Sequence, residues 1–267
     1  MRIFREPGAL QRWCRAQKLA GRRIALVPTM GYLHEGHISL IEAAKRRGAD
    51  EIVVSVFVNP VQFGPNEDYA TYPRDERADL AKCRLAGATA VFFPTPENMY
   101  LPRHSVYVSE EDLSKGLCGA RRPGHFRGVC TVVAKLFNLA HPDFAVFGQK
   151  DYQQAQVIRR MVRDLNFDLD VVVAPIVREE SGLAKSSRNT YLSDEERSRA
   201  LAISRGLRGF RSLAGLRRSL ERAGLKVDYV ECVDAETLEP RKKPGKGCCV
   251  LVAAYSGRTR LIDNILL

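Results

Sequence analysis

Residues 28–37 read PTMGYLHEGH and directly follow the short apolar run IALV at residues 24–27. The residues after them, 38–47, carry apolar side chains at the spacing of one helix face. We therefore expect a strand, a loop and a helix that begins close to His37. Free backbone N–H groups and the positive end of the helix dipole meet at such a junction, which makes it a binding site for anions.

Further short apolar runs alternate with helical patterns along the chain. The predicted strands cover residues 24–27, 52–58, 90–93, 144–147 and 169–173, and the predicted helices cover residues 38–47, 75–85, 128–140 and 152–165. Continuous apolar strands that alternate with helices indicate βαβ units and a sheet covered on both faces. The sequence therefore predicts an α/β fold with a doubly wound parallel sheet, in which ligands bind beyond the carboxyl ends of the strands.

A smaller α+β part is expected after this sheet. Pro175 marks the end of the first part, and Ser193 followed by three acidic residues is a typical helix start. Later strands are predicted at residues 227–233 and 248–254. We expect two domains, residues 1–176 and residues 177–267.

Two histidines, His34 and His37, lie three residues apart at the expected helix start. Imidazoles on a first helical turn can donate hydrogen bonds to phosphate, which suits chemistry at the α-phosphate of a nucleotide. A zinc site is one alternative, but the helical zinc motif needs histidines at i and i+4, whereas His34 and His37 are at i and i+3. His104, His125 and His141 have no ligand spacing to each other. A strand–helix junction with incidental histidines is the remaining alternative.

Composition narrows the class of protein. The chain has 267 residues, 45% of them hydrophobic and 27% charged, with a formal net charge of +11. Its start lacks the apolar core of a signal peptide, and no run is long enough to span a membrane, so we expect a cytoplasmic protein without a membrane partner. Seven cysteines without a CxxC pair indicate reduced thiols. The basic residues are interleaved with glutamates, which favours solvated helix faces over a nucleic-acid surface.

Three more segments carry polar residues at expected strand ends or linkers. Gln62 follows the second strand and suits a substrate with hydroxyl and carboxylate groups, or else stabilises its own loop. Lys150 follows Gly148 at a helix start, where two positive features would hold an anion, unless the lysine faces solvent. The SSR triplet at residues 186–188 offers two hydroxyls and a guanidinium for a triphosphate, although such triplets are also frequent on surfaces.

Taken together, five segments in order resemble the pantothenate synthetase family. They read PTMGYLHEGHISL, FVNPVQFGPNEDYATYPRD, RRPGHFRGVCTVVAKLFN, FGQKDYQQAQVIRRMVRDLNF and GLAKSSRNTYL, and the resemblance resumes with VDYVECVD and RLIDN. Members of the family join pantoate to β-alanine at the expense of ATP and release AMP and pyrophosphate. The resemblance implies a Rossmann-like first domain, a C-terminal lid, a homodimer, and magnesium bound with ATP.

The resemblance also implies roles for individual residues. The catalytic residues would be His34, His37 and Lys150. The acid and the amine substrates would contact Gln62, Gln154 and Arg122. The ATP site would comprise Met30, Gly31, Tyr32, Leu33, His34, Glu35, Gly36, His37, Gly148, Gln149, Lys150, Asp151, Val177, Lys185, Ser186, Ser187 and Arg188.

The chain departs from the family pattern at three places. Lys185 stands where the family usually has methionine, and residues 206–224 form a shorter stretch than usual. Asp79 lies in the region expected for a magnesium ligand, but Ala78 and Lys82 do not resemble a carboxylate-rich site. The protein ligands of magnesium therefore stay open, and the ion would be held mainly by ATP oxygens.

We expect a ligase that forms a pantoyl adenylate and then passes the acyl group to β-alanine. One alternative is a nucleotidyltransferase of the same superfamily that stops at a nucleotidyl product. The FVNPVQF and GQKDYQQ segments argue against it, since they supply a second polar pocket. The other alternative, an RNA-binding module, is motivated by the net charge but lacks the usual aromatic or GXXG motifs.

Overall fold

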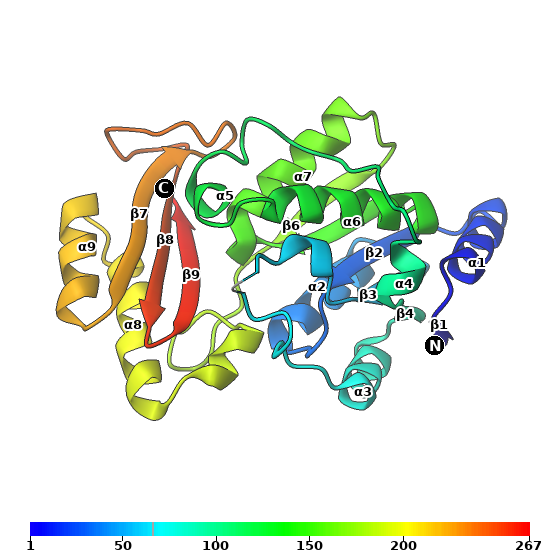
Figure 1. Ribbon diagram of the computed structural model, residues 1–267, viewed down its shortest axis with the longest axis horizontal. Coiled ribbons are helices and arrows are strands. Elements are labelled where there is room, and N and C mark those ends of the chain that lie inside the picture. The colour runs from blue at the N-terminus through cyan, green and yellow to red at the C-terminus, as the bar shows by residue number, and fades with distance from the viewer. Residues whose placement is uncertain (66) are drawn as a thin grey trace. The chain divides into compact units, whose positions relative to one another are not determined.

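The computed structural model describes residues 1–65 and 67–267, which form two compact units. The first unit comprises residues 1–148 and 157–174, and the second comprises residues 149–156 and 175–267 (Figure 1). Residues 149–156 were expected in the first domain but group with the second unit. The division into two functional domains, residues 1–176 and residues 177–267, stays a prediction.

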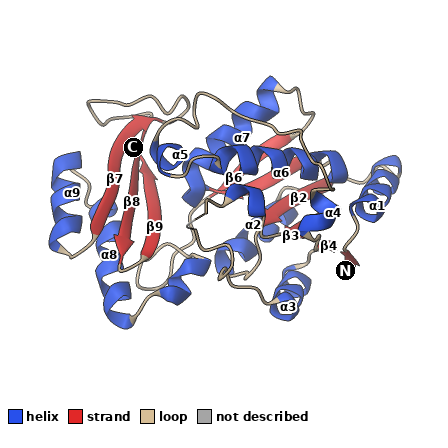
Figure 2. Cartoon of the chain, viewed as in Figure 1, coloured by secondary structure: helices blue, strands red, loops and turns tan. Residues whose placement is uncertain are grey.

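The first unit is built on a six-stranded sheet in which every pair of neighbours is parallel, in the order β1-β4-β3-β2-β5-β6 (Figure 2). The strands are β1 (Arg2–Phe4), β2 (Ile24–Thr29), β3 (Glu51–Val56), β4 (Ala90–Phe92), β5 (Phe144–Gly148) and β6 (Asp170–Ala174). Strand β2 lies between β3 and β5, so the order of strands reverses beside it. Ligands of such sheets bind outside the carboxyl ends of the strands at this reversal.

Helices pack against the sheet because its central strands are apolar on both faces. The helices of the first unit are α1 (Pro7–Leu19), α2 (Glu35–Arg46), α3 (Glu76–Ala86), α4 (Pro96–Met99), α5 (Leu117–Arg121), α6 (His125–Ala140) and α7 (Tyr152–Asp164), the last of which begins within the second unit. Ala25 and Val27 of β2 share a core cluster with Leu40 of α2. The alternate residues, Ile24 and Leu26, are equally buried and point to the other face of β2, where α1 and α6 pack. The expected α/β sheet covered on both faces is confirmed.

The second unit contains an antiparallel sheet in the order β7-β8-β9. Its elements are α8 (Asp194–Arg208), α9 (Leu213–Arg222), β7 (Lys226–Asp234), β8 (Cys248–Ser256) and β9 (Thr259–Leu266). Ser193 caps α8 as expected: its hydroxyl accepts from Glu196 N, and the Glu196 carboxylate accepts from Ser193 N. Apolar residues of both helices and all three strands form one core. This is the small α+β part that the sequence predicts.

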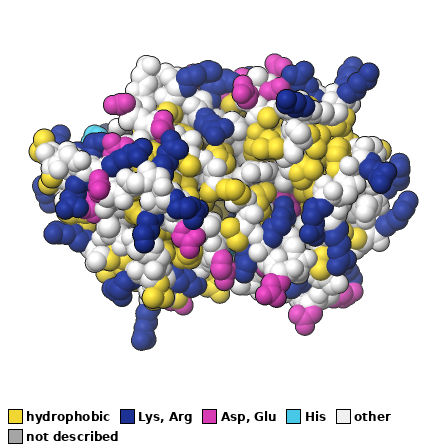
Figure 3. Space-filling model, turned by 180° about the vertical axis from the view of Figure 1, so that it is seen from behind, with side chains coloured by type: hydrophobic (Ala, Val, Ile, Leu, Met, Phe, Trp, Pro, Cys, Tyr) yellow, Lys and Arg dark blue, Asp and Glu magenta, His cyan; other side chains and the backbone are white. Residues whose placement is uncertain are grey.

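Charged side chains are interspersed over the surface. On the face shown in Figure 3, lysines and arginines are scattered, with acidic side chains among them. Helix pairs such as Arg199–Glu195 and Arg217–Glu221 have i, i+4 spacing. This pattern is typical of solvated helix faces. Among the described residues, none belongs to a helix long and apolar enough to cross a membrane.

Candidate active site

The loop after β2 turns through two consecutive residues with left-handed backbone. Gly31 has a φ of 85° and Tyr32 a φ of 51°. A Cβ at position 31 would lie 2.8 Å from the Val56 side chain and 3.0 Å from the Asp79 carboxylate, so glycine is required there. A left-handed tyrosine is unfavourable and needs local support. The loop is therefore a constrained turn that fixes where α2 begins.

That support comes from α3. The Asp79 carboxylate accepts from Tyr32 N at 2.8 Å and from Leu33 N at 2.7 Å, and Lys82 Nζ donates to Leu33 O at 2.6 Å. Burial raises the pKa of the Asp79 carboxyl, although both N–H bonds and the Lys82 charge act in the opposite direction. Asp79, which the sequence places near a magnesium site, thus has both oxygens engaged by backbone N–H groups.

The two histidines cap α2 reciprocally. His34 is the N-cap residue, and its Nδ1 accepts from Gly36 N at 3.1 Å. Nδ1 of His37 accepts from His34 N at 3.2 Å, and the two ring centroids are 4.1 Å apart. Because each Nδ1 accepts, the proton of each neutral ring resides on Nε2. The sequence predicts histidine donors at this helix start, and the capping bonds fix the tautomer in which Nε2 is the donor.

A buried amide chain lies next to this loop. Asn59 is fully buried: its Oδ1 accepts from the Tyr100 hydroxyl at 2.7 Å and from Val61 N, while its Nδ2 donates to Gly128 O at 3.0 Å and to Gln62 Oε1 at 3.1 Å. These contacts leave Nε2 as the donor end of Gln62. It points to Met30 Sδ at 3.0 Å.

Gln62 is therefore an oriented donor beside residue 30 of the loop that contains the two histidines. Sequence reasoning missed Asn59 and Tyr100. Asn59 could have been found from its place between the strand and Gln62, whereas nothing local marks Tyr100.

Arg122 takes part in an ion pair that braces the Gln62 segment. It donates two bonds to the Glu67 carboxylate, at 2.7 and 2.6 Å, and its Nη1 lies 3.0 Å from His125 Nε2. Since arginine only donates, His125 Nε2 accepts and Nδ1 donates to Gln62 O at 2.9 Å. Burial would raise the pKa of Glu67, but Arg122 holds it below its usual value. Arg122, expected near the acid substrate, is engaged within the protein.

In the second unit, the segment after β5 is tied to the end of the chain. Gln149 and Asn264 exchange hydrogen bonds, including Asn264 Nδ2 to Gln149 O at 3.0 Å. Lys150 Nζ lies 3.0 Å from the Asp151 carboxylate and is largely buried, with 22% of its side chain exposed. Gln154 follows one turn later on α7. Gly148, the end of β5, has open space where a Cβ would lie.

The linker that carries the predicted triphosphate residues is a braced turn. Lys185 N donates to Val177 O at 2.9 Å, and Ser186 caps a short 3₁₀ helix, Ser187–Tyr191, by accepting from Arg188 N. Asn189 Nδ2 and Arg197 both donate to the Glu179 carboxylate. Val177 and residues 185–188 are therefore close together within the second unit.

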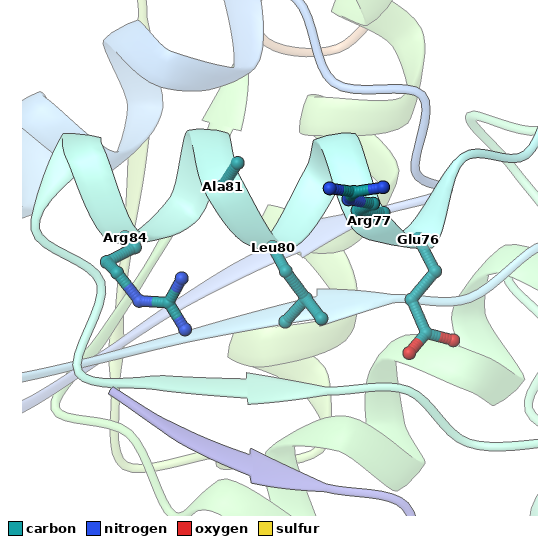
Figure 4. Close-up of a pocket in the computed structure, with 5 residues that line it drawn as sticks. All are labelled: Glu76, Arg77, Leu80, Ala81 and Arg84. Atoms are coloured by element: carbon teal, nitrogen blue, oxygen red, sulfur yellow. The ribbon is translucent and has the colours of Figure 1, made fainter.

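The described residues show no group of three or more His, Cys, Asp or Glu side chains that could hold a metal ion. A cavity of about 450 Å³ lies against α3 and is lined by Glu76, Arg77, Leu80, Ala81 and Arg84 (Figure 4). It includes none of the predicted site residues. The structure thus groups the predicted residues into one set on the first unit and one on the second.

A parallel sheet whose central strand runs into a histidine-capped helix defines the class of α/β enzymes that bind ligands at strand ends. A family model described as pantoate-beta-alanine ligase matches residues 2–266, and the chain belongs to this family. The pantothenate synthetase of Myxococcus xanthus is 56% identical over 270 residues, covering 96% of this chain and 92% of that protein. That of Moorella thermoacetica is 49% identical over 280 residues, covering 100% and 99%.

Solved structures agree with this assignment. Pantothenate synthetase from Thermus thermophilus superposes with a TM-score of 0.90 at 44% identity, covering 100% of this chain and 99% of that one. Pantoate-beta-alanine ligase from Francisella tularensis, complexed with beta-gamma ATP and beta-alanine, gives a TM-score of 0.88 at 34% identity, covering 100% and 97%. The expected family and fold class are confirmed.

Proposed function

We propose that this chain condenses pantoate with β-alanine at the expense of ATP, through a pantoyl adenylate. The observation that carries the proposal is the reciprocal histidine cap. It presents two Nε2 donors at the N-terminus of α2, where the helix dipole already favours negative charge. The neighbouring Gln62 amide adds a second polar position, which a simple nucleotidyltransferase would not need.

In the first half-reaction, a pantoate carboxylate oxygen attacks the α-phosphorus of ATP. The bond from this phosphorus to the bridging oxygen breaks, and pyrophosphate leaves with the electron pair. Charge grows on the α-phosphate oxygens, so preorganised donors lower the barrier. We assign this role to His34, His37 and Lys150, and triphosphate binding to Arg188 with Ser186 and Ser187. The other predicted ATP contacts at residues 30–37, 148–151, 177 and 185 stay predictions.

In the second half-reaction, the β-alanine amine attacks the acyl carbon of the adenylate. The carbon–oxygen bond to AMP breaks, AMP leaves with the electron pair, and the nitrogen passes a proton to solvent. Gln62 and Gln154 would orient the acid, with Gln62 also close to the amine. The Asn59 contact supports the role of Gln62, because it directs an N–H donor toward acceptor oxygens of the substrate. Arg122 would act mainly through its brace on the Gln62 segment.

Magnesium would accompany ATP and neutralise part of its phosphate charge. The described residues do not fit a protein-held site, since they include no carboxylate cluster and Asp79 is engaged by the backbone. We therefore assign magnesium to ATP oxygens and derive no step from it. A homodimer and a cytoplasmic location likewise remain predictions, as does the absence of a nucleic-acid partner.

Exchange of labelled pyrophosphate into ATP tests the stepwise mechanism. Pantoate alone should support exchange, because adenylation is complete before the amine is needed. Strict dependence on β-alanine would contradict an adenylate intermediate. Exchange that requires a phosphorylated acceptor in place of pantoate would instead favour a nucleotidyltransferase. Binding of RNA at physiological salt would support the nucleic-acid alternative.

A further inference from the structure

We infer that Asp79 and Lys82 of α3 are positioning residues. They hold the loop of residues 30–34, the histidine loop, in its active backbone conformation. This inference rests on the proposed function, because it explains how the two histidine donors are kept in place. Neither side chain is assigned a contact with substrate. They act on the peptide groups directly before His34.

The two side chains bind both the backbone N–H and the backbone C=O of Leu33. Leu33 N donates to Asp79 Oδ1, and Leu33 O accepts from Lys82 Nζ at 2.6 Å. Tyr32 N donates to Asp79 Oδ2. Asp79 is only 1% exposed, so its carboxylate has little access to solvent. Three backbone groups of the turn thus depend on two side chains of a helix that starts more than forty residues later.

The arrangement follows from the geometry of α3. Residues three apart lie on the same helix face, so Asp79 and Lys82 can reach the same segment. Asp79 lies in the first turn of α3, where a carboxylate is favoured by the helix dipole. Asp75 caps this helix by accepting from Ala78 N. The anchor is therefore a rigid element, not a second loop.

The turn needs such an anchor because its conformation is unfavourable alone. Tyr32 has a φ of 51°, which L-residues other than glycine seldom adopt. Without the carboxylate, Tyr32 N and Leu33 N would lose their partners, and the turn could relax to a more extended backbone. His34 follows immediately, so its ring and its capping bond to Gly36 N would move with the turn.

Asp79→Asn is the informative variant, because the amide keeps the shape but replaces one acceptor by an NH₂ group that faces a backbone N–H. Lys82→Met removes the other contact and keeps the length of the side chain. Asp75→Asn is the matched control: it makes the same chemical change on the same helix, and asparagine caps helices as well as aspartate does. We expect this control to behave as the wild type.

The first measurement is independent of activity. Hydrogen–deuterium exchange should increase in peptides that span residues 28–37 in Asp79→Asn and Lys82→Met, while peptides of β3 and α6 keep their protection. Unchanged exchange at residues 28–37 in both variants would overturn the inference. This result would hold even if the chain did not make pantothenate, so the two proposals can fail separately.

The second measurement separates positioning from metal binding. Pantoate-dependent pyrophosphate exchange should fall about 10- to 100-fold in kcat for Asp79→Asn, as expected for a small displacement of catalytic donors. The magnesium concentration for half-maximal rate should stay unchanged, and so should the dissociation constant for pantoate. Recovery of the full rate at high magnesium would identify Asp79 as a metal ligand and overturn the inference.

Discussion

Replacing Asn59 by aspartate tests whether the buried hydrogen bond from Asn59 to Gln62 fixes which end of the Gln62 amide is the donor. The wild-type Nδ2 donates to two acceptors, Gly128 O and Gln62 Oε1, while Oδ1 accepts from the Tyr100 hydroxyl and Val61 N. In Asn59→Asp an oxygen would replace Nδ2 and face both acceptors. The shape is conserved, so the change acts through hydrogen bonding and charge.

The expected loss of folding stability is large because Asn59 is fully buried. Two buried acceptors lose their donor, at roughly 1–3 kcal/mol each, so unfolding should become easier by about 2–6 kcal/mol at neutral pH. Burial raises the pKa of the new carboxyl above its unfolded value of about 3.9. The folded state then binds the proton more tightly, so the loss should shrink as pH falls toward this value. The protonated acid can donate again.

The sole tryptophan makes the assay specific. Trp13 lies in α1 of the first unit, the same unit as Asn59, so its fluorescence during urea unfolding reports on this unit. Asn138→Asp, an exposed change in the last turn of α6, is the control. A carboxylate is unfavourable at this end of a helix, so the control should lower stability by no more than about 1 kcal/mol. An unchanged urea midpoint at pH 7, or a loss that does not shrink on acidification, would refute the reasoning.

Three further predictions concern other residues. His34→Ala and His37→Ala should each lower pantoate-dependent pyrophosphate exchange by about two to three orders of magnitude, as for other preorganised donors, and near-normal rates in both would exclude the phosphate role. Lys150→Ala should lower kcat for exchange more than it raises KM for ATP, whereas a change in KM alone would mark a contact made equally in the ground state. Glu67→Gln removes the carboxylate that pairs with Arg122. The pKa of Glu67 is lowered in the folded state, so the wild type should have a higher urea midpoint than Glu67→Gln above the ordinary pKa of 4.5. This difference should vanish as pH falls through the lower pKa of the folded state. A difference in midpoint that does not depend on pH would contradict the prediction.

Local patterns predict the elements that carry the site. The apolar runs at residues 24–27 and 144–147 correspond to β2 and β5, and the polar residues after them begin helices as expected. Four elements of the first unit escaped prediction: β1, α1 and the short helices α4 and α5. Strand β1 has three residues at the edge of the sheet, too few for a pattern, and α1 is largely exposed, with Leu10 and Cys14 as its fully buried residues.

The supports of the site could not be predicted, because they join distant parts of the chain. The bond from Leu33 to Asp79 spans 46 residues, and that from Asn59 to Gly128 spans 69. The sequence around a buried aspartate or asparagine does not show whether its side chain binds a ligand or the backbone. Only the folded positions show that Asp79 faces two N–H groups.

The burial of every cysteine gives the protein an internal set of chemical reporters. Cys14, Cys83, Cys118 and Cys130 lie in the first unit, and the three others lie in β7 and β8 of the second. Burial raises the pKa of Cys14 to about 12, and a buried thiol held in its neutral form reacts slowly with alkylating reagents. Each modification then records an opening of the unit that contains it. Mass spectrometry of alkylated peptides could therefore time the opening of each unit separately, without any engineered label.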